Sequence, residues 1–161
     1  MDSNSCNFED LAGVLEKKAK DRFRVEKQVL AEIGVIVKNK AKDMIGHEQP
    51  EFPPLSPVTK DDRVAHGYPE NEPLLRDGYL KKSIGYNVKC GVREKSVMIG
   101  YKTGYPCDSY AKAQEEGDGY IPARPLLKAS YLREYKHIKF ITSILGRVFN
   151  TPLRKEYSSN G

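Results

Sequence analysis

Apolar residues recur with a helical period over residues 8–44. Their three- or four-residue spacing, interrupted once by the charged Glu26, places them on one face of a helix. The stripe consists of Phe8, Leu11, Leu15, Ala19, Phe23, Leu30, Ile33, Val37, Ala41 and Met44. Asn7 is a suitable N-cap and Gly46 a suitable stop, so residues 1–46 are predicted to hold a long amphipathic helix. Such a helix measures roughly 55 Å at about 1.5 Å per residue, which leaves part of the stripe for another subunit unless Gly34 bends or breaks it.

Residues 47–72 lose this period and are rich in proline. Five prolines stand among polar residues, namely Pro50, Pro53, Pro54, Pro57 and Pro69. Proline disfavours helix at its own position and at the residue before it, so residues 49–55 are predicted to be extended and polyproline-like. We expect residues 47–72 to form a stiff loop, or arm, that packs on a neighbouring surface.

A short turn and a hairpin are predicted to follow. Pro73-Leu74-Leu75 is typical of a short helical turn that ends at Gly78, because proline suits the first helical position. In residues 83–102, apolar and polar residues alternate on both sides of a short glycine-led loop, which predicts an antiparallel hairpin. A two-stranded sheet needs a third strand or helices to lean on. Candidate third strands are residues 80–82 and residues 52–58.

Two more helices complete the pattern. Residues 110–116 have a helical composition that is closed by Gly117. Pro125 opens a C-terminal helix predicted over residues 125–150. Its apolar positions are Leu127, Tyr131, Tyr135, Ile138, Ile141, Leu145 and Val148. Residues 151–161 are polar and are expected to fray.

Together these elements predict a single α+β domain over residues 1–161. It combines the long N-terminal helix, a small curved antiparallel sheet with a central hairpin, and a C-terminal helix packed on that sheet. The hairpin and the short helices lie in residues 73–125. A chain of 161 residues has room for one core of ordinary size and not for two.

The charge balance permits an acidic partner without demanding one. The chain carries 27 basic and 22 acidic residues, for a net charge of +5. The densest basic stretches, in residues 17–20, 38–42 and 133–139, lie inside helical patterns, where a solvated polar face is the ordinary explanation. A sequence-independent nucleic-acid-binding module therefore stays an alternative, one that predicts duplex affinity falling steeply with salt.

The cysteines and the N-terminus indicate a reducing compartment. Cys6, Cys90 and Cys107 are odd in number and widely spaced, which argues against a disulfide framework. The first residues lack a basic and apolar leader, and no run approaches the length of a membrane span. We expect a protein that is made and stays in the cytoplasm and does not contact a membrane.

The inventory of reactive residues argues against catalysis. His47, His66 and His137 stand far apart, with no nucleophile motif, phosphate-binding glycine loop or metal-ligand spacing near them. We therefore expect no enzymatic activity, no cofactor and no metal site. The rival hypothesis is a small hydrolase, which would need His66 to meet Cys107 or Asp108.

A few polar and sulfur-bearing residues of the middle segment allow two interpretations each. Arg124 lies between prolines and either forms a bidentate pair with a carboxylate or is solvated. Its candidate partners are Asp77, Glu115, Glu116 and Asp118. The tyrosines serve either as interface edges or as core bulk. They are Tyr68, Tyr79, Tyr101, Tyr105, Tyr110 and Tyr120. Cys107 is either an exposed thiol or, as we favour, a buried small hydrophobe.

Four segments share a content of proline and glycine around small apolar clusters: residues 52–59, 73–80, 110–117 and 121–127. Their order resembles that of the virion morphogenesis proteins of tailed bacteriophages, the small neck or tail-completion proteins that join capsid to tail. The residues that carry the resemblance, and that we take as interface or fold-defining, are Phe52, Pro54, Leu55, Pro73, Leu74, Gly78, Leu80, Tyr110, Ala111, Gly117, Pro122, Arg124 and Pro125. Phe52 stands where the family often has Trp, and Leu126-Leu127 replaces a common Phe-Leu.

The resemblance implies a structural role in a virion. It implies a ring of identical subunits, a hexamer or dodecamer, at the head-to-tail junction. Its partners would be the portal or connector, head-completion proteins, and the tail tube or tail terminator. Genomic DNA would pass through the lumen without sequence recognition. Residues 49–59 and 110–124 are expected to form much of the contact between subunits, and a tail terminator or minor tail protein is the nearest alternative.

Overall fold

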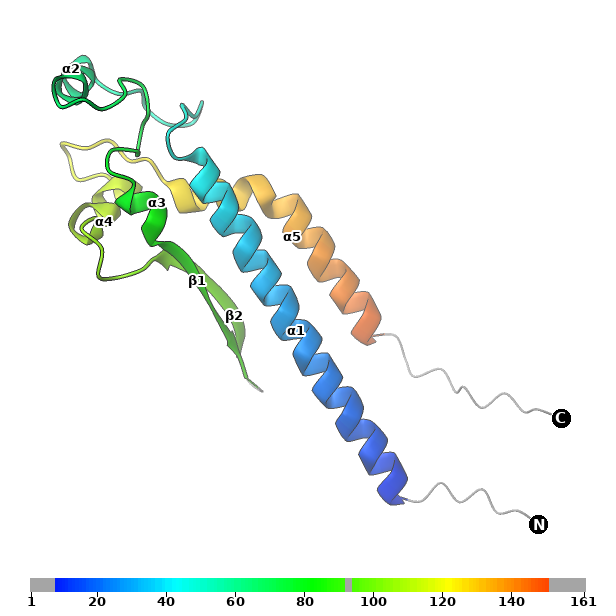
Figure 1. Ribbon diagram of the computed structural model, residues 1–161. Coiled ribbons are helices and arrows are strands. Elements are labelled where there is room, and N and C mark those ends of the chain that lie inside the picture. The colour runs from blue at the N-terminus through cyan, green and yellow to red at the C-terminus, as the bar shows by residue number, and fades with distance from the viewer. Residues whose placement is uncertain (1–7, 92–93, 151–161) are drawn as a thin grey trace, which may run out of the picture.

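The computed structural model describes residues 8–91 and 94–150 and has the mixed α+β architecture that the sequence predicts (Figure 1). The elements in chain order are α1 (Phe8–Met44), α2 (Pro57–Ala65), α3 (Tyr79–Ser83), β1 (Ile84–Cys90), β2 (Lys95–Tyr101), α4 (Asp108–Glu116) and α5 (Leu126–Asn150). The predicted N-cap at Asn7 and the predicted frayed tail lie outside the described residues.

Helix α1 is the central element, with α5 packed along one side and the β1–β2 hairpin along another (Figure 1). We call α1, the hairpin and α5 together the stalk. Ile33 and Val37 of α1 are buried with Ile138 of α5. Gly34 neither breaks nor ends α1. Instead, the ring of Tyr86 occupies the space of the missing side chain, because a Cβ atom there would lie 2.5 Å from Tyr86 Cδ2.

The hairpin pairs in a single antiparallel register, from Ile84 opposite Tyr101 to Cys90 opposite Lys95. Within the described residues the sheet has two strands, so neither candidate third strand forms, and the alternative of support by helices is confirmed. Residues 80–82 belong to α3, and residues 52–58 lead into α2. The hairpin leans on α1 instead, and this packing supplies the support that an isolated pair of strands lacks.

Short helices and loops gather at the C-terminal end of α1 (Figure 1). They comprise residues 45–83 and 102–125, which we call the head. A buried cluster joins them to the stalk. Its members are Ala41, Met44, Ile45, Phe52, Leu80, Ile84, Cys107, Ala111, Leu126 and Ala129. The two sequence-distant halves of the head therefore share one core, which also contains the C-terminal end of α1 and the first turn of α5.

The prediction that residues 47–72 contain no helix is wrong, because α2 lies within them. Ser56 is its N-cap, with Oγ accepting a hydrogen bond from the Thr59 backbone at 3.2 Å. Pro57 occupies the start of the helix, where a missing N–H costs nothing because that group has no partner in a helix anyway. The helix is not evident from the sequence because the five prolines of this segment favour an extended loop and outweigh the capping pattern of Ser56 and Pro57.

The predicted helical turn at Pro73-Leu74-Leu75 is also wrong. These residues form a non-helical turn in which Leu74 has a φ of 64°, in the left-handed region. Gly78 starts a helix rather than ending one, since it is the N-cap residue of α3 and has a φ of 78°. By contrast, Gly117 closes α4 as predicted, with a φ of 77° that favours glycine.

Candidate assembly site in the head

Arg124 connects the end of the 121–125 loop to the proline arm. Its side chain is only 6% exposed. The guanidinium donates hydrogen bonds to the carbonyl oxygens of Pro53, from Nε at 3.2 Å and Nη2 at 3.1 Å, and of Pro54, from Nη2 at 3.2 Å. Burial lowers the pKa of this guanidinium from its ordinary value. The arm and the start of α5 are thereby held together across about seventy residues of sequence.

Both predictions for Arg124 are corrected by this geometry. In the part of the chain that the structure describes, its side-chain hydrogen bonds go to carbonyl groups, and none of the four candidate carboxylates is among these partners. It is not a solvated loop arginine either. An extended proline segment leaves its carbonyl oxygens without helix or sheet partners, so a buried multi-donor cation is a suitable partner for them.

Glu115 joins three elements at the opposite side of the same junction. Its Oε1 accepts a hydrogen bond from the Tyr101 hydroxyl at 2.7 Å and another from the Leu127 backbone N–H at 2.9 Å. The carboxylate thus sits at the N-terminal end of α5, where the helix dipole favours negative charge. Burial and the nearby Glu115 raise the pKa of Tyr101. The end of β2, helix α4 and helix α5 are fixed to one another by this one side chain.

The 117–125 loop is shaped by backbone constraints. The Arg124 N–H donates to the Gln114 carbonyl at 2.7 Å. A Cβ atom at Gly117 would lie 3.2 Å from the Ala123 nitrogen and from the Ile121 carbonyl oxygen. Glycine therefore suits position 117 both for its positive φ and for this close approach of the backbone.

A second buried arginine, Arg63, holds α2 in place. It donates to the Pro69 carbonyl from Nε at 2.8 Å and to the Leu75 carbonyl from Nη2. Sequence reasoning missed this residue, because its acceptors are backbone atoms that leave no signature in the amino-acid pattern. The head therefore contains two arginines that bind proline-rich loops through main-chain oxygens.

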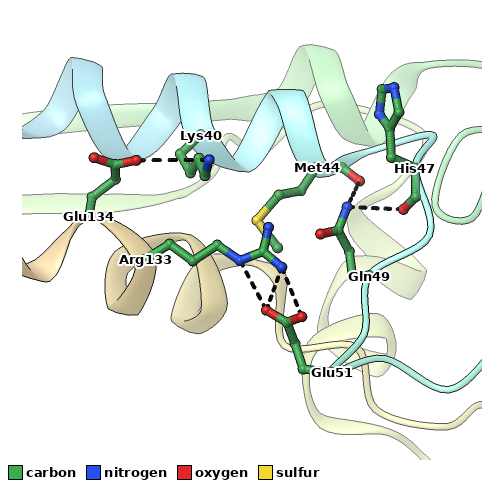
Figure 2. Close-up of polar contacts among 7 residues, drawn as sticks. All are labelled: Lys40, Met44, His47, Gln49, Glu51, Arg133 and Glu134. Carbon is green, nitrogen blue, oxygen red and sulfur yellow. Dashed lines mark hydrogen bonds and ion pairs between the residues drawn. The ribbon is translucent and has the colours of Figure 1, made fainter.

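Figure 2 shows how the start of the arm is fixed to the stalk. The Gln49 amide donates to the carbonyl oxygens of Met44 and His47, both at 3.1 Å. Glu51 accepts a bidentate pair from Arg133 of α5, with Nη2 at 2.7 Å from Oε1 and 2.8 Å from Oε2. The backbone and Arg133 lower the pKa of Glu51. The start of the arm thus packs on its own chain, and its expected contact with a neighbouring subunit stays a prediction.

The thirteen residues singled out from the sequence all lie in the head, and they differ in burial. Five are buried: Phe52, Pro73, Leu80, Ala111 and Arg124. Six are partly buried: Leu55, Leu74, Gly78, Tyr110, Gly117 and Pro125. The remaining two, Pro54 and Pro122, are exposed. Side chains that are already buried in the chain's own core are not free to contact a neighbour, so these five residues act by shaping the head.

Three of the tyrosines supply core bulk, and the interface interpretation stays a prediction for the exposed ones. Tyr101, Tyr105 and Tyr110 pack against the head core, and burial near Asp77 raises the pKa of Tyr110 to about 12. Tyr120 is 97% exposed. It is displayed on a turn in which Asp118 Oδ1 accepts from the Tyr120 N–H at 3.0 Å. Cys107 is fully buried, as we favoured.

The geometry offers no support for a hydrolytic site in the described part of the chain. His66 Nδ1 lies 3.1 Å from Asp62 Oδ1, and Asp108 Oδ2 accepts from the Gly104 N–H at 2.7 Å. Neither contact brings His66 to Cys107 or Asp108. No group of three or more His, Cys, Asp or Glu side chains suited to a metal ion occurs among the described residues.

Exposed apolar side chains lie along the stalk. Some belong to the apolar stripes predicted for residues 8–44 and 125–150, and the others lie outside those stripes. The exposed residues are Val14, Leu15, Phe23, Met98, Tyr131, Leu132, Tyr135, Phe140, Ile144 and Val148. Several lie in the N-terminal part of α1, which extends past the described end of α5 and past the hairpin (Figure 1). Within the described residues, no helix is long and apolar enough to span a bilayer. The stalk is therefore a second candidate surface for assembly.

No protein-family model, curated protein or solved structure matches this chain. The resemblance to phage morphogenesis proteins accordingly stays a prediction.

Proposed function

We propose that this chain is a structural subunit of the neck of a tailed-phage virion, a tail-completion protein that forms a ring at the head-to-tail junction. The observation that supports this proposal best is the convergence of the four proline- and glycine-rich segments on the head. Arg124, Glu115 and Arg63 hold these segments in place through hydrogen bonds to backbone groups. The side chains of these three residues fix the shape of the head, and the proposal gives them no role in a reaction.

The proposal assigns different tasks to the two parts of the molecule. The head, with its fixed loops, supplies a rigid docking surface for the portal, the connector or the tail tube. The stalk, with its uncovered apolar residues, supplies contacts that require further protein, because exposed apolar groups gathered on one element favour association. The neck role involves no catalysis and no cofactor. DNA would cross the lumen of the ring without base-specific contacts.

The nearest alternative is a tail terminator or minor tail protein, which would use the same shape at a different position. A sequence-independent nucleic-acid-binding module is a second alternative, which the excess of basic residues in the exposed N-terminal part of α1 favours. Residues 12–27 of α1 hold six basic and three acidic residues, and much of this region is exposed. A purely nucleic-acid-binding protein would bind duplex DNA with an affinity that falls steeply with salt and would be absent from particles.

Labelling of particles tests the proposed function. Antibodies raised against the purified chain would be applied, with gold conjugates, to particles released by cells that encode it. We expect one gold site per particle, between head and tail, and unjoined heads and tails when the gene is deleted. Restoring the gene on a plasmid controls for effects on neighbouring genes. Particles that join normally without the chain, or that never carry it, would contradict the proposal.

A further inference from the structure

The N-terminal part of α1 presents an apolar and basic face that residues 8–91 and 94–150 of its own chain leave exposed. Val14 and Leu15 are 52% and 51% exposed. Lys18 follows Val14 by four residues and Leu15 by three, so the three side chains lie on one side of the helix. Arg22, one turn further on, marks the point where α5 begins to cover α1, because its guanidinium lies 5.2 Å from the Phe149 ring. We call Val14, Leu15 and Lys18 the stalk face.

Helix α2 presents a face of complementary chemistry at the other end of the molecule. Val58, Asp61, Asp62 and Ala65 recur at the i, i+3, i+4 and i+7 positions of one helical side, and all four are exposed. Val58 is 77% exposed. The buried Arg63 anchors α2 to the rest of the head. We call these four residues the head face.

The charges around the two faces are opposite in sign. Residues 12–27 hold six basic and three acidic residues, whereas residues 47–77 hold seven acidic and three basic ones. Among the described residues, no hydrogen bond or ion pair is made by the side chain of Lys18 or of Asp61. Asp62 is already engaged, since its Oδ2 lies 3.7 Å from Arg76 Nη2. Of the three charged residues on the two faces, Lys18 and Asp61 are therefore the ones that remain available for a contact between copies.

We propose that the head face of one copy packs across the stalk face of a second copy of this chain. Val58 would cover Val14 and Leu15 at the centre, and Asp61 would pair with Lys18 at the rim. Two stalk faces would oppose lysine to lysine, and two head faces would oppose aspartate to aspartate. Only the contact between unlike faces satisfies the charges.

This inference deepens the proposed function and rests on it for the ring. A contact between unlike faces is heterologous, so each copy uses its head face toward one neighbour and its stalk face toward the other. The two faces lie at opposite ends of the molecule (Figure 1). Such an arrangement propagates from copy to copy and closes when the rotation per copy divides a full turn.

A charge exchange between two variants tests the contact. Lys18→Glu and Asp61→Lys each place like charges across the proposed contact, so each variant alone should self-associate roughly tenfold or more weakly than the wild type. In an equimolar mixture, the reversed stalk face of the first variant meets the reversed head face of the second, and the two unchanged faces meet as in the wild type. The mixture should therefore recover association close to that of the wild type. Sedimentation velocity over a concentration series measures all four samples.

Lys17→Glu is the matched control. It makes the same change of charge one residue earlier, about 100° around the axis of α1, beside Val14 but away from Leu15 and from the proposed ion pair, and should weaken association far less than Lys18→Glu. Circular dichroism establishes that each variant is folded. If a reversal disturbs folding, the neutral pair Lys18→Gln and Asp61→Asn replaces it, and each is then expected to weaken association severalfold.

Several results would overturn the contact. They are a wild type that stays monomeric at every concentration, single variants that associate normally, a mixture that does not recover, and a Lys17→Glu variant that is as weak as Lys18→Glu. Loss of duplex DNA binding by Lys18→Glu with unchanged self-association would assign the stalk face to DNA instead. If the sedimentation test fails, the particle labelling can still support the neck role. If the labelling fails, a measured contact between copies can still hold, so the two proposals are tested separately.

Discussion

Replacing Arg124 should loosen the junction between the proline arm and α5. Arg124→Met keeps a long apolar stem but removes the donors that reach the carbonyl oxygens of Pro53 and Pro54 at 3.1–3.2 Å. Two backbone acceptors are then left in a partly buried site without their protein partner. The arm remains attached through the Glu51–Arg133 pair, so we expect the fold to persist with lower stability.

The magnitude follows from the hydrogen bonds. Bonds to a charged group contribute about 1.5–3 kcal/mol each, and the three contacts share two acceptors, which gives a gross contribution of about 3–6 kcal/mol. The unfavourable burial of the guanidinium offsets part of this, so the net loss of unfolding free energy should be about 2–4 kcal/mol. In a domain of this size, each kcal/mol lowers Tm by about 2–4 °C. Tm should therefore fall by roughly 4–16 °C.

Thermal and chemical denaturation measure this loss, and amide hydrogen exchange locates it. The N–H groups of Phe52 and Leu55 should exchange faster in Arg124→Met, because they flank the released prolines. Arg124→Lys should fall between the two, since an ammonium lacks the planar set of donors that spans both carbonyls.

Arg76→Met is the matched control for this prediction. Arg76 is an exposed arginine of the same head, 3.7 Å from an Asp62 oxygen and stacked on Tyr68. Its loss should cost no more than about 1 kcal/mol. If Arg124→Met were no less stable than Arg76→Met, water would be replacing the guanidinium at the two carbonyls, and the structural role assigned to Arg124 would be refuted.

Three further predictions concern packing, backbone and pH. Gly34→Ala should destabilise the protein by about 1–2 kcal/mol because the new methyl group meets the Tyr86 ring. In a Tyr86→Ala background the same change should instead stabilise the protein by about 1 kcal/mol, because alanine favours helix over glycine. Urea denaturation of the four proteins in a double-mutant cycle measures both values. Gly117→Ala should lower Tm through its positive φ and tight backbone contacts, whereas Gly146→Ala, in open space on α5, should raise it slightly. Glu26 is a buried residue of α1, and hydrogen bonds from Lys95 and Arg22 lower its pKa below 4.5. Its contribution to the unfolding free energy is therefore present above that pH and is lost as the pH falls through the folded-state pKa. The Glu26→Gln variant should therefore be less stable than the wild type at pH 7, and the difference should shrink in acid titrations of unfolding free energy.

The elements with a sustained period were predictable from the sequence. Helices α1 and α5 and the hairpin follow patterns that repeat over many residues, so neighbouring positions reinforce one another. Gly117 was predictable because helix closure by glycine is local chemistry. The Tyr86 ring over Gly34 was not, because it depends on how a distant strand packs on the helix. The sequence therefore predicted which elements form, while their mutual fit depended on the tertiary structure.

The head was harder to predict because opposing local signals meet there. Proline at position 57 both disfavours helix at the residue before it and suits the first helical turn, and the Ser56 cap decides between these effects. The prolines around Arg124 predict a constrained backbone there, but the sequence favours carboxylates or water, not backbone carbonyls, as the partners of its side chain. Backbone carbonyls are available at every position, so a sequence gives no reason to prefer those of Pro53 and Pro54.

The partly covered surfaces also set the strength of the proposed contact between copies. Burying a Val or Leu side chain fully contributes about 1.5–3 kcal/mol, and Val14, Leu15 and Val58 retain between half and three-quarters of their exposure. Covering all three therefore offers about 3–5 kcal/mol before the cost of association, and a rim ion pair adds about 1 kcal/mol or less. One such contact is too weak to hold two copies together at low concentration. A ring is different, because its last copy forms two contacts in a single association step, so closure adds the second contact at a high effective concentration. The proposed faces thus predict a chain that is monomeric at low concentration and associates as its concentration rises, which is the range that the sedimentation series covers.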